Sequence, residues 1–297
     1  MADLRFGVDL GGTKTELIAL EGSVERWRRR VPTPSNDYAA IVETIASLDR
    51  DATEALGQRG SLGIGTPGSV SPKTGRMRNC NTVVLNGQPL RADIEAAVGR
   101  GVRFANDANC FALSEATDGA GQGAGVVFGA ILGTGVGGGV VVSGKLVEGT
   151  NGIGGEWGHS PMPIVFGDEH PGPACYCGRT GCVERFLSGP GMADDHARRY
   201  GGQASAAEIA ASSDPSCAQT VERYASRLAK ALSGVVNLLD PDVIVLGGGL
   251  SNVTRLYTRV PALLAEHAFS DVLETRLVPP QHGDSSGVRG AAWLWKD

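Results

Sequence analysis

The stretch Phe6-Gly7-Val8-Asp9-Leu10-Gly11-Gly12-Thr13 is repeated in outline by Phe128-Gly129-Ala130-Ile131-Leu132-Gly133-Thr134-Gly135. Each stretch has the pattern of a buried strand that ends in a glycine turn. A second strand, a turn with a glycine (Gly22 or Gly144) and a third strand follow in both halves. Self-similarity of this kind is typical of a duplicated unit. We therefore expect an α/β protein that contains a strand-turn-strand-turn-strand unit twice.

Composition excludes several classes of protein. The chain has 297 residues, of which 41% are hydrophobic and 20% are charged, so it can form packed cores and is not a disordered protein. The net charge is −5, and the one basic run is residues 26–30, so no nucleic-acid partner is expected. Residues 119–143 carry no charge, but glycines break the middle of this stretch and make a membrane helix unfavourable. We expect two strands there and no membrane partner.

Further elements follow from periodicity and capping residues. Apolar spacing predicts a helix over 38–56, capped by Ser35 or Asn36, and one from Pro215 that Asp214 caps. A last helix, capped by Ser285 or Ser286, is predicted to run through Trp295. Short strands are expected at 61–65, 102–105 and 242–246, with another at 145–148. We expect a small lobe over 1–118, to which helix 285–297 returns, and a large lobe over 119–284.

The glycine turns are candidate nucleotide-binding sites, because backbone N–H groups can approach a phosphate closely where side chains are absent. Asp9, at the end of its strand, could hold Mg²⁺ directly or through water. Glycines after the strand at 242–246 form a flat surface on which an adenine ring could lie. The candidate nucleotide-binding residues are Asp9, Gly11, Gly12, Thr13, Lys14, Gly133, Thr134, Gly135, Gly137, Gly248 and Gly249.

Asp107 is the candidate catalytic base. It belongs to Ala105-Asn106-Asp107-Ala108-Asn109, where a strand ends and a helix starts. One of these side chains is enough to cap the helix, yet three polar side chains gather here. A general base needs a carboxylate within hydrogen-bond reach of a substrate hydroxyl. Asp107 is suited to that position, with helix capping as the simpler alternative.

One histidine and three cysteines form a candidate zinc site. They are His159, in Gly155-Glu156-Trp157-Gly158-His159, and the three thiols of the run from Cys175 through Cys177 to Cys182. A Cys₃His set predicts a closed tetrahedral site, which is structural rather than catalytic. Glycines at 178 and 181 permit a tight knuckle. The N-terminal residues lack a signal-peptide pattern, so we expect a cytoplasmic protein, in which clustered thiols favour metal over disulfides.

Two glutamates adjoin this zinc site. Glu156 precedes His159 by three residues, and Glu184 follows Cys182 by two. Zinc would fix both carboxylates by holding the loops that carry them. Two carboxylates that face one cleft suit the vicinal hydroxyls of a sugar, and the alternative is that both are surface residues.

These motifs together resemble those of the ROK sugar kinases (repressor, open reading frame, kinase), over essentially the whole chain. Within that family the chain looks most like bacterial fructokinases of the manno(fructo)kinase type. The similar stretches are 7–20, 81–89, 175–189, 240–252 and 282–295.

The resemblance implies a two-lobed actin-like (ribonuclease-H-like) ATPase fold with a zinc-binding loop. It also implies transfer of the γ-phosphoryl group of ATP to a hexose, namely D-fructose to give fructose 6-phosphate, with mannose as a further candidate. It implies Mg²⁺ and structural Zn²⁺ as cofactors and a homodimer as the assembly. Asp107 would be the base, and His159 would serve both metal and sugar. The sugar-binding residues that the resemblance implies are Gly68, Asn81, Asn106, Asp107, Glu156, His159 and Glu184.

Other functions stay open at this point. Kinases of the same family for N-acetylglucosamine, N-acetylmannosamine or glucose are alternatives, since sequence patterns do not rank sugars. A sugar-responsive transcriptional regulator would need a helix-turn-helix, and the first turn already begins at Gly11. An actin-like assembly protein would have no evident use for the Cys₃His set. The acidic loop at 164–174 is less familiar and could alter the sugar pocket.

Overall fold

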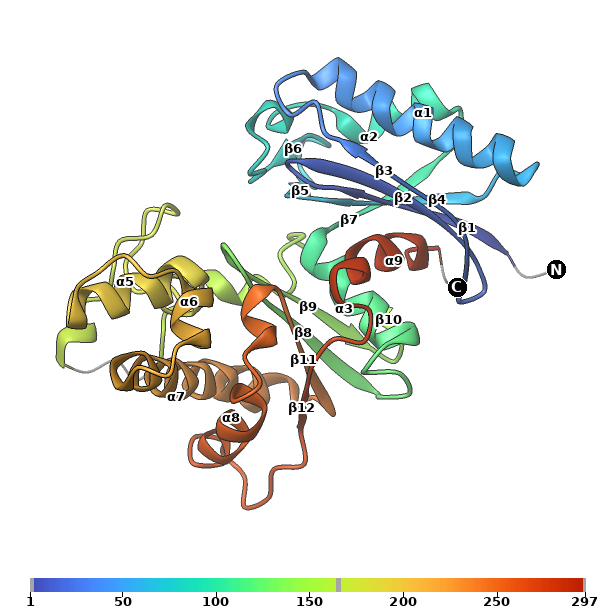
Figure 1. The fold of residues 1–297 in the computed structure, drawn as a ribbon. Helices are drawn as coiled ribbons and strands as arrows, with labels where there is room; N and C mark the ends of the chain where they lie inside the picture. The colour runs from blue at the N-terminus through green and yellow to red at the C-terminus, as the bar shows by residue number, and fades with distance from the viewer. Residues whose placement is uncertain (1–2, 164–166, 296–297) are drawn as a thin grey trace.

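Two five-stranded sheets of the same design form the protein (Figure 1). The computed structural model describes residues 3–163 and 167–295. The first sheet contains β1 (Leu4–Leu10), β2 (Lys14–Glu21), β3 (Val24–Pro32), β4 (Ser61–Thr66) and β7 (Val102–Asn106). The second contains β8 (Val126–Leu132), β9 (Val136–Val142), β10 (Lys145–Leu146), β11 (Val243–Gly247) and β12 (Arg276–Val278). A separate small hairpin joins β5 (Ser69–Val70) to β6 (Met77–Arg78).

The strand orders, β3-β2-β1-β4-β7 and β10-β9-β8-β11-β12, correspond position by position. In the first sheet β1 pairs antiparallel with β2 and parallel with β4. In the second sheet β8 pairs antiparallel with β9 and parallel with β11. The predicted duplication is therefore confirmed. The uncharged stretch after residue 119 forms β8 and β9, as expected, and no helix in the described part of the chain is long and apolar enough to cross a membrane.

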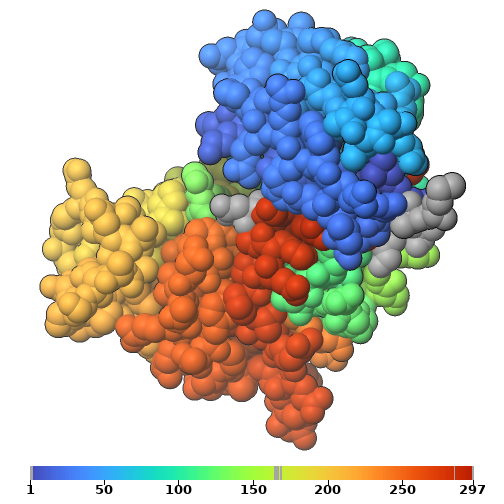
Figure 2. Space-filling model, turned by 45° about the vertical axis from the view of Figure 1, so that its right-hand side comes forward, coloured from blue at the N-terminus to red at the C-terminus, as the bar shows by residue number. Residues whose placement is uncertain are grey.

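Helices lie in three groups around these sheets (Figure 1). The outer face of the first sheet is covered by α1 (Tyr38–Leu56) and α2 (Leu90–Val98). Between the sheets lie α3 (Asp107–Asp118) and α9 (Ser286–Trp293). Beyond the second sheet lie α4 (Glu184–Leu187), α5 (Gly189–Tyr200), α6 (Ala206–Ala211), α7 (Pro215–Leu239) and α8 (Leu256–Ala265). In the space-filling view the red C-terminal segment lies between the blue lobe and the green and orange lobe (Figure 2).

Side chains along the strands point alternately to the two faces of each sheet, and each face packs against a hydrophobic core. Phe128, Ala130 and Leu132 of β8 face the core formed with α7, whereas Val127 faces the layer of α3 and α9. Successive side chains of a strand point to opposite faces, so one apolar strand can serve both layers. The first sheet divides in the same way, because Ile18 of β2 joins the middle layer. This explains why β8 and β11 are almost continuously apolar, whereas the edge strand β3 carries mostly exposed and charged side chains.

Glycines bring α9 very close to the first sheet and to α3. A Cβ atom at Gly7 of β1 would lie 2.2 Å from Val288 O, and one at Gly63 of β4 would lie 1.9 Å from Ala291 O. Gly290 of α9 meets α3 in the same way, since a Cβ there would lie 1.7 Å from Cys110 O. These contacts are with backbone, which cannot rotate away. Part of the high glycine content therefore serves packing rather than ligand binding.

We expect Gly290→Ala to lower the free energy of unfolding by about 3 kcal/mol, because the added methyl must push α9 away from α3. The matched control is Gly234→Ala in α7, where a Cβ meets nothing within 4 Å. That variant should be more stable by about 0.5–1 kcal/mol, since alanine loses less backbone entropy in a helix. Urea denaturation of both variants checks the pair. Equal effects of the two substitutions would contradict the packing role of Gly290.

Several element boundaries differ from the sequence predictions, and α9 ends at Trp293 rather than at Trp295. Helix α1 is capped by Asp37, whose side chain accepts a hydrogen bond from Ala40 N (3.0 Å), rather than by Ser35 or Asn36. Ser285 makes no capping bond to α9, and the Ser286 hydroxyl instead donates to Glu115 (2.7 Å). β10 covers only residues 145–146. Asp214 does cap α7, as predicted. The lobe boundary at residue 118 stays a prediction.

Candidate active site

The two glycine turns occupy corresponding places in the two sheets. Gly11 N donates to Lys14 O (3.0 Å) in the β1–β2 turn, and Gly133 N donates to Gly135 O (3.0 Å) in the β8–β9 turn. Gly248, at φ 77°, lies against the second turn, because a Cβ there would be 2.5 Å from Leu132 O. The second and third glycine runs thus meet. Gly137, predicted as part of the turn, lies instead within β9, with its Cα packed toward Ala108.

A cavity of about 810 Å³ lies at the first turn, and we call it the Asp107 cavity. Asp107 opens α3 and points one carboxylate oxygen at Ala108 N (2.8 Å). The cavity brings this side chain together with Asp9 and the first turn, although these residues are far apart in the sequence. Its lining is Asp9, Leu10, Gly11, Gly12, Thr13, Ser35, Asn36, Pro67, Asn81, Thr82, Val83, Val84 and Asp107.

Both carboxyl groups of this cavity have raised pKa values. The Asp107 side chain is open to solvent inside the cavity. Protein atoms nevertheless surround it on most sides, and this desolvation raises its pKa against the opposing effect of the Ala108 N–H; the charge of Glu156 raises it further. Desolvation, followed by the charges of Asp107 and Glu16, raises the pKa of Asp9 to about 6. Two carboxylates in one cleft repel each other, and a bound divalent cation would relieve this repulsion.

We expect Asp9→Asn to stabilise the protein at pH 8 while impairing its activity. The folded protein holds the Asp9 proton more tightly than the unfolded chain does, so ionisation of Asp9 costs stability increasingly as pH rises from about 4 to about 6. Asparagine removes that cost, a gain on the order of 1–3 kcal/mol at pH 8 that should be absent at pH 4. Thermal melts at both pH values test this. The surface variant Asp271→Asn should show no such difference, and an equal gain at both pH values would contradict the explanation.

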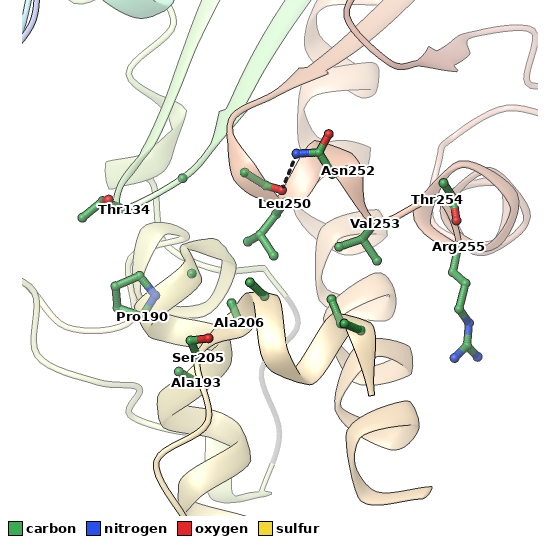
Figure 3. A pocket seen from close by; sticks show the side chains of 16 residues that line it. Thr134, Pro190, Ala193, Ser205, Ala206, Leu250, Asn252, Val253, Thr254 and Arg255 are labelled. Atoms are coloured by element: carbon green, nitrogen blue, oxygen red, sulfur yellow. Dashed lines mark hydrogen bonds between the residues drawn. The ribbon is translucent and has the colours of Figure 1, made fainter. Parts of the chain in front are cut away.

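A second cavity, of about 860 Å³, lies at the second turn, and we call it the Thr134 cavity (Figure 3). Small side chains of α6 and its surroundings form one wall, and Leu250 and Val253 face them. Asn252 Nδ2 donates to Gly249 O (3.2 Å) and so holds the third glycine run in shape. The lining is Gly133, Thr134, Gly189, Pro190, Ala193, Ser205, Ala206, Ala207, Ala210, Ala211, Gly249, Leu250, Asn252, Val253, Thr254 and Arg255.

The structure places only some of the candidate residues on the linings of these two cavities. Asn106 Oδ1 accepts from Asn109 N (2.7 Å), so its side chain caps α3. Glu184 is buried, and its Oε2 accepts from Val136 N (3.0 Å) next to the second turn. Among the described residues, neither cavity lining includes Lys14, Gly68, Asn106, Gly135, Gly137, Glu156, His159, Glu184 or Gly248.

Residues that the sequence analysis missed include Ser205 and Thr82. Ser205 caps α6 in a capping box with Glu208, a pattern that is readable from sequence. Its place on the Thr134 cavity is not readable, because it depends on how α6 packs beside the second turn.

The predicted metal ligands form one cluster. The candidate ligand atoms of His159, Cys175, Cys177 and Cys182 all lie within 4.8 Å of one another. Cys177 Sγ is 3.6 Å from Cys182 Sγ, and Cys175 Sγ is 3.7 Å from His159 Nδ1. Ligands of a tetrahedral zinc ion lie about 3.8 Å apart, so the spacing fits zinc. The cluster is consistent with a structural zinc site.

The segment that carries His159 also packs on β9. Trp157 Nε1 donates to Gly137 O (2.7 Å), and a Cβ at Gly158 would lie 2.0 Å from Val136 O. Glu184, which follows Cys182 by two residues, also contacts this strand, because its Oε2 accepts from Val136 N. Both flanks of the metal cluster therefore brace the strand that begins at the second turn. His159 Nε2 lies 3.0 Å from the Tyr176 hydroxyl.

Comparison with known proteins identifies the family to which the chain belongs. A model of the ROK family matches residues 5–297. The chain belongs to the ROK family. It is 40% identical to an N-acetyl-D-glucosamine kinase of Yersinia enterocolitica, over 97% of this chain and 98% of that one, and 41% identical to one of Salmonella gallinarum with the same coverage.

Solved structures of ROK proteins are also similar. A ROK hexokinase from Thermus thermophilus has a TM-score of 0.87 and 31% identity, over 97% of this chain and 96% of that one. A ROK glucokinase from Streptomyces griseus, solved with glucose and AMPPNP, has a TM-score of 0.78 and 28% identity, over 98% of both chains. The predicted two-lobed actin-like ATPase fold is thereby confirmed. The curated relatives above do not support the fructokinase assignment within the family.

Proposed function

We propose that this ROK-family protein is a kinase that transfers the γ-phosphoryl group of ATP to a hydroxyl group of a hexose. The observation that carries the proposal is the position of Asp107 in one cavity with Asp9 and the Gly11–Thr13 turn. Phosphoryl transfer needs positioned groups and neutralised charge more than covalent chemistry by the protein. A carboxylate, a glycine turn and a second carboxylate are suitable groups for this task.

In the proposed reaction Asp107 accepts the proton of the sugar hydroxyl as that oxygen attacks the γ-phosphorus and ADP leaves. The raised pKa makes the Asp107 carboxylate a stronger base. A general base is most effective when its pKa lies near the working pH. Asp9 would hold Mg²⁺, which would offset the negative charge of the phosphates. The backbone N–H groups of the two glycine turns would contact the phosphates from opposite lobes.

The Thr134 cavity is the proposed site of the nucleoside. Its alanine wall, Leu250 and Val253 form an apolar surface against which a flat ring would pack (Figure 3). Gly133 and Thr134 lie at its edge, where the chain turns back toward β9. Lys14, Gly135, Gly137 and Gly248 remain proposed contributors from outside the lining.

N-acetyl-D-glucosamine is the proposed substrate, because relatives about 40% identical over nearly the whole chain carry that name. D-Fructose is the second candidate. The fructokinase-like stretch 81–89 supplies four residues of the Asp107 cavity lining, so this resemblance concerns the site itself. Sugar preference turns on differences of about 1–3 kcal/mol when apolar pockets discriminate, so identity alone does not fix it. We propose Gly68, Asn81, Asn106, Glu156, His159 and Glu184 as further sugar-site residues, and a homodimer as the assembly.

Initial rates with ATP and Mg²⁺ on N-acetylglucosamine, fructose, mannose and glucose at equal concentrations test the function. The highest kcat/KM on N-acetylglucosamine is expected. A preference for fructose would favour the second candidate. Absence of turnover on every sugar, by a preparation that contains zinc, would overturn the kinase proposal.

A further inference from the structure

Thr33 holds the first glycine turn from behind. Its backbone N–H donates to Thr13 O (2.9 Å), and its hydroxyl donates to Gly11 O (2.8 Å). The Thr15 hydroxyl lies 2.8 Å from the Thr33 hydroxyl, and Thr15 is the donor of this bond because the Thr33 proton is already used. Both threonines are buried, and neither lines the Asp107 cavity. A chain of two buried hydroxyls therefore ends on one carbonyl of the turn.

The backbone at Thr33 is itself fixed by its neighbours. Pro32 and Pro34 stand on either side of it. A proline fixes its own φ and restricts the residue before it to an extended conformation. Ser35 N donates to Thr33 O (2.8 Å), and Asp37 N donates to Pro34 O (2.9 Å). The segment between β3 and α1 is thus a stiff support for the turn.

The bond from the Thr33 hydroxyl decides where one amide group of the turn points. In a trans peptide, the C=O of one residue and the N–H of the next point in opposite directions. The Gly11 carbonyl points toward Thr33, so the N–H of Gly12 points away from it. Gly12 and Thr13 are exposed and line the cavity. Among the residues that the structure describes, no backbone carbonyl accepts from the N–H of Gly12 or of Thr13.

We propose that Thr33 is the positioning residue of the phosphate-binding turn, a role that rests on the proposed kinase function. Its hydroxyl keeps the partial negative charge of the Gly11 carbonyl turned away from the phosphates, and it keeps the Gly12 N–H turned toward them. The peptide between Gly11 and Gly12 needs such a support, because a glycine on each side leaves it unusually free to rotate. A donor that is already oriented binds without the cost of reorganisation.

The test compares Thr33→Val, which keeps the shape and removes the hydroxyl, with Thr33→Ser, which keeps the hydroxyl. The probes are the ATP analogue AMPPNP with Mg²⁺, and adenosine, which has no phosphate. In isothermal titration calorimetry, Thr33→Val should weaken AMPPNP binding roughly three- to tenfold and leave adenosine binding unchanged. Thr33→Ser should bind both probes within about twofold of the wild type. In steady-state kinetics, Thr33→Val should raise the KM for ATP and leave the KM for the sugar unchanged.

The matched control is Thr275→Val. The Thr275 hydroxyl also donates to a backbone carbonyl of another segment, Pro241 O (2.8 Å), but Thr275 lines neither cavity. Both valine variants should lower the melting temperature by a similar amount, about 2–4 °C, because each loses one hydrogen bond. Only Thr33→Val should lose affinity for AMPPNP.

Unchanged AMPPNP binding by Thr33→Val would overturn the proposal. An equal loss of AMPPNP affinity in Thr275→Val, or an equal loss of adenosine affinity in Thr33→Val, would also overturn it, because the effect would then be general rather than directed at phosphate. If Thr33→Val does not fold, Thr33→Ala removes the same hydroxyl from a smaller side chain and should give the same result. A wild type that binds AMPPNP but phosphorylates no sugar would refute the kinase proposal and leave the role of Thr33 intact.

Discussion

Asp107→Asn is expected to lower kcat by about 10²–10⁴-fold while the fold is retained. The asparagine oxygen can still accept the hydrogen bond from Ala108 N that Asp107 accepts now. The start of α3 should therefore keep its geometry, and sugar binding should weaken little. What is lost is the group that accepts the proton of the attacking hydroxyl. Coupled assay of ADP release, with circular dichroism to check folding, measures both parts.

The control for this variant is Asp214→Asn. Asp214 also stands at a helix start, where its side chain accepts from Ser216 N (2.7 Å), but it lines neither cavity. Its kcat should match that of the wild type. Full activity of Asp107→Asn would show that Asp107 serves only the helix start, and the assignment of the base would be wrong.

Cys177→Ser is expected to abolish stoichiometric zinc binding and to lower the melting temperature by about 10 °C, since metal binding and folding are coupled. The effect should reach the active site. His159 belongs to the cluster and Glu184 adjoins it in the chain, and the segment 157–158 and Glu184 both contact β9 at Val136 or Gly137. Loosening them should raise the KM for ATP, because the second turn leads directly into this strand. Elemental analysis measures the bound zinc, thermal melts measure the melting temperature, and steady-state kinetics measure the KM for ATP.

Cys217→Ser is the matched control, because Cys217 is a free thiol in α7 outside the cluster. It should retain zinc and its kinetic constants. The wild type treated with a strong chelator should behave like Cys177→Ser, and added zinc should restore only the chelated wild type. Normal stability of the zinc-free protein would contradict a structural role for the metal.

The fold was predictable where the evidence was local and repeated. The glycine turns after Leu10 and Leu132 each follow a buried strand, and their shared pattern was enough to predict two equivalent sheets. The Cys₃His ligands were predictable because three of them fall in one short run whose glycines, Gly178 and Gly181, take the positive φ values that a knuckle needs.

Other features depended on contacts between distant segments. The sequence predicts Glu184 as a sugar-binding carboxylate, with a surface position as the alternative, and only the structure shows that it is buried next to Val136 N, 48 residues away in sequence. Asp37, rather than Ser35 or Asn36, caps α1. A shift of one residue in the start of the helix changes which side chain faces Ala40 N.

The position of α9 has a consequence for biogenesis. This helix packs against Gly7 and Gly63, on two strands of the first sheet, yet it follows every strand of the second sheet in the chain. On the ribosome, the part of the first sheet that α9 covers therefore stays exposed until residues 286–293 have left the exit tunnel. Nascent chains stalled before that point should recruit holdase chaperones, and release of the final helix should end that dependence.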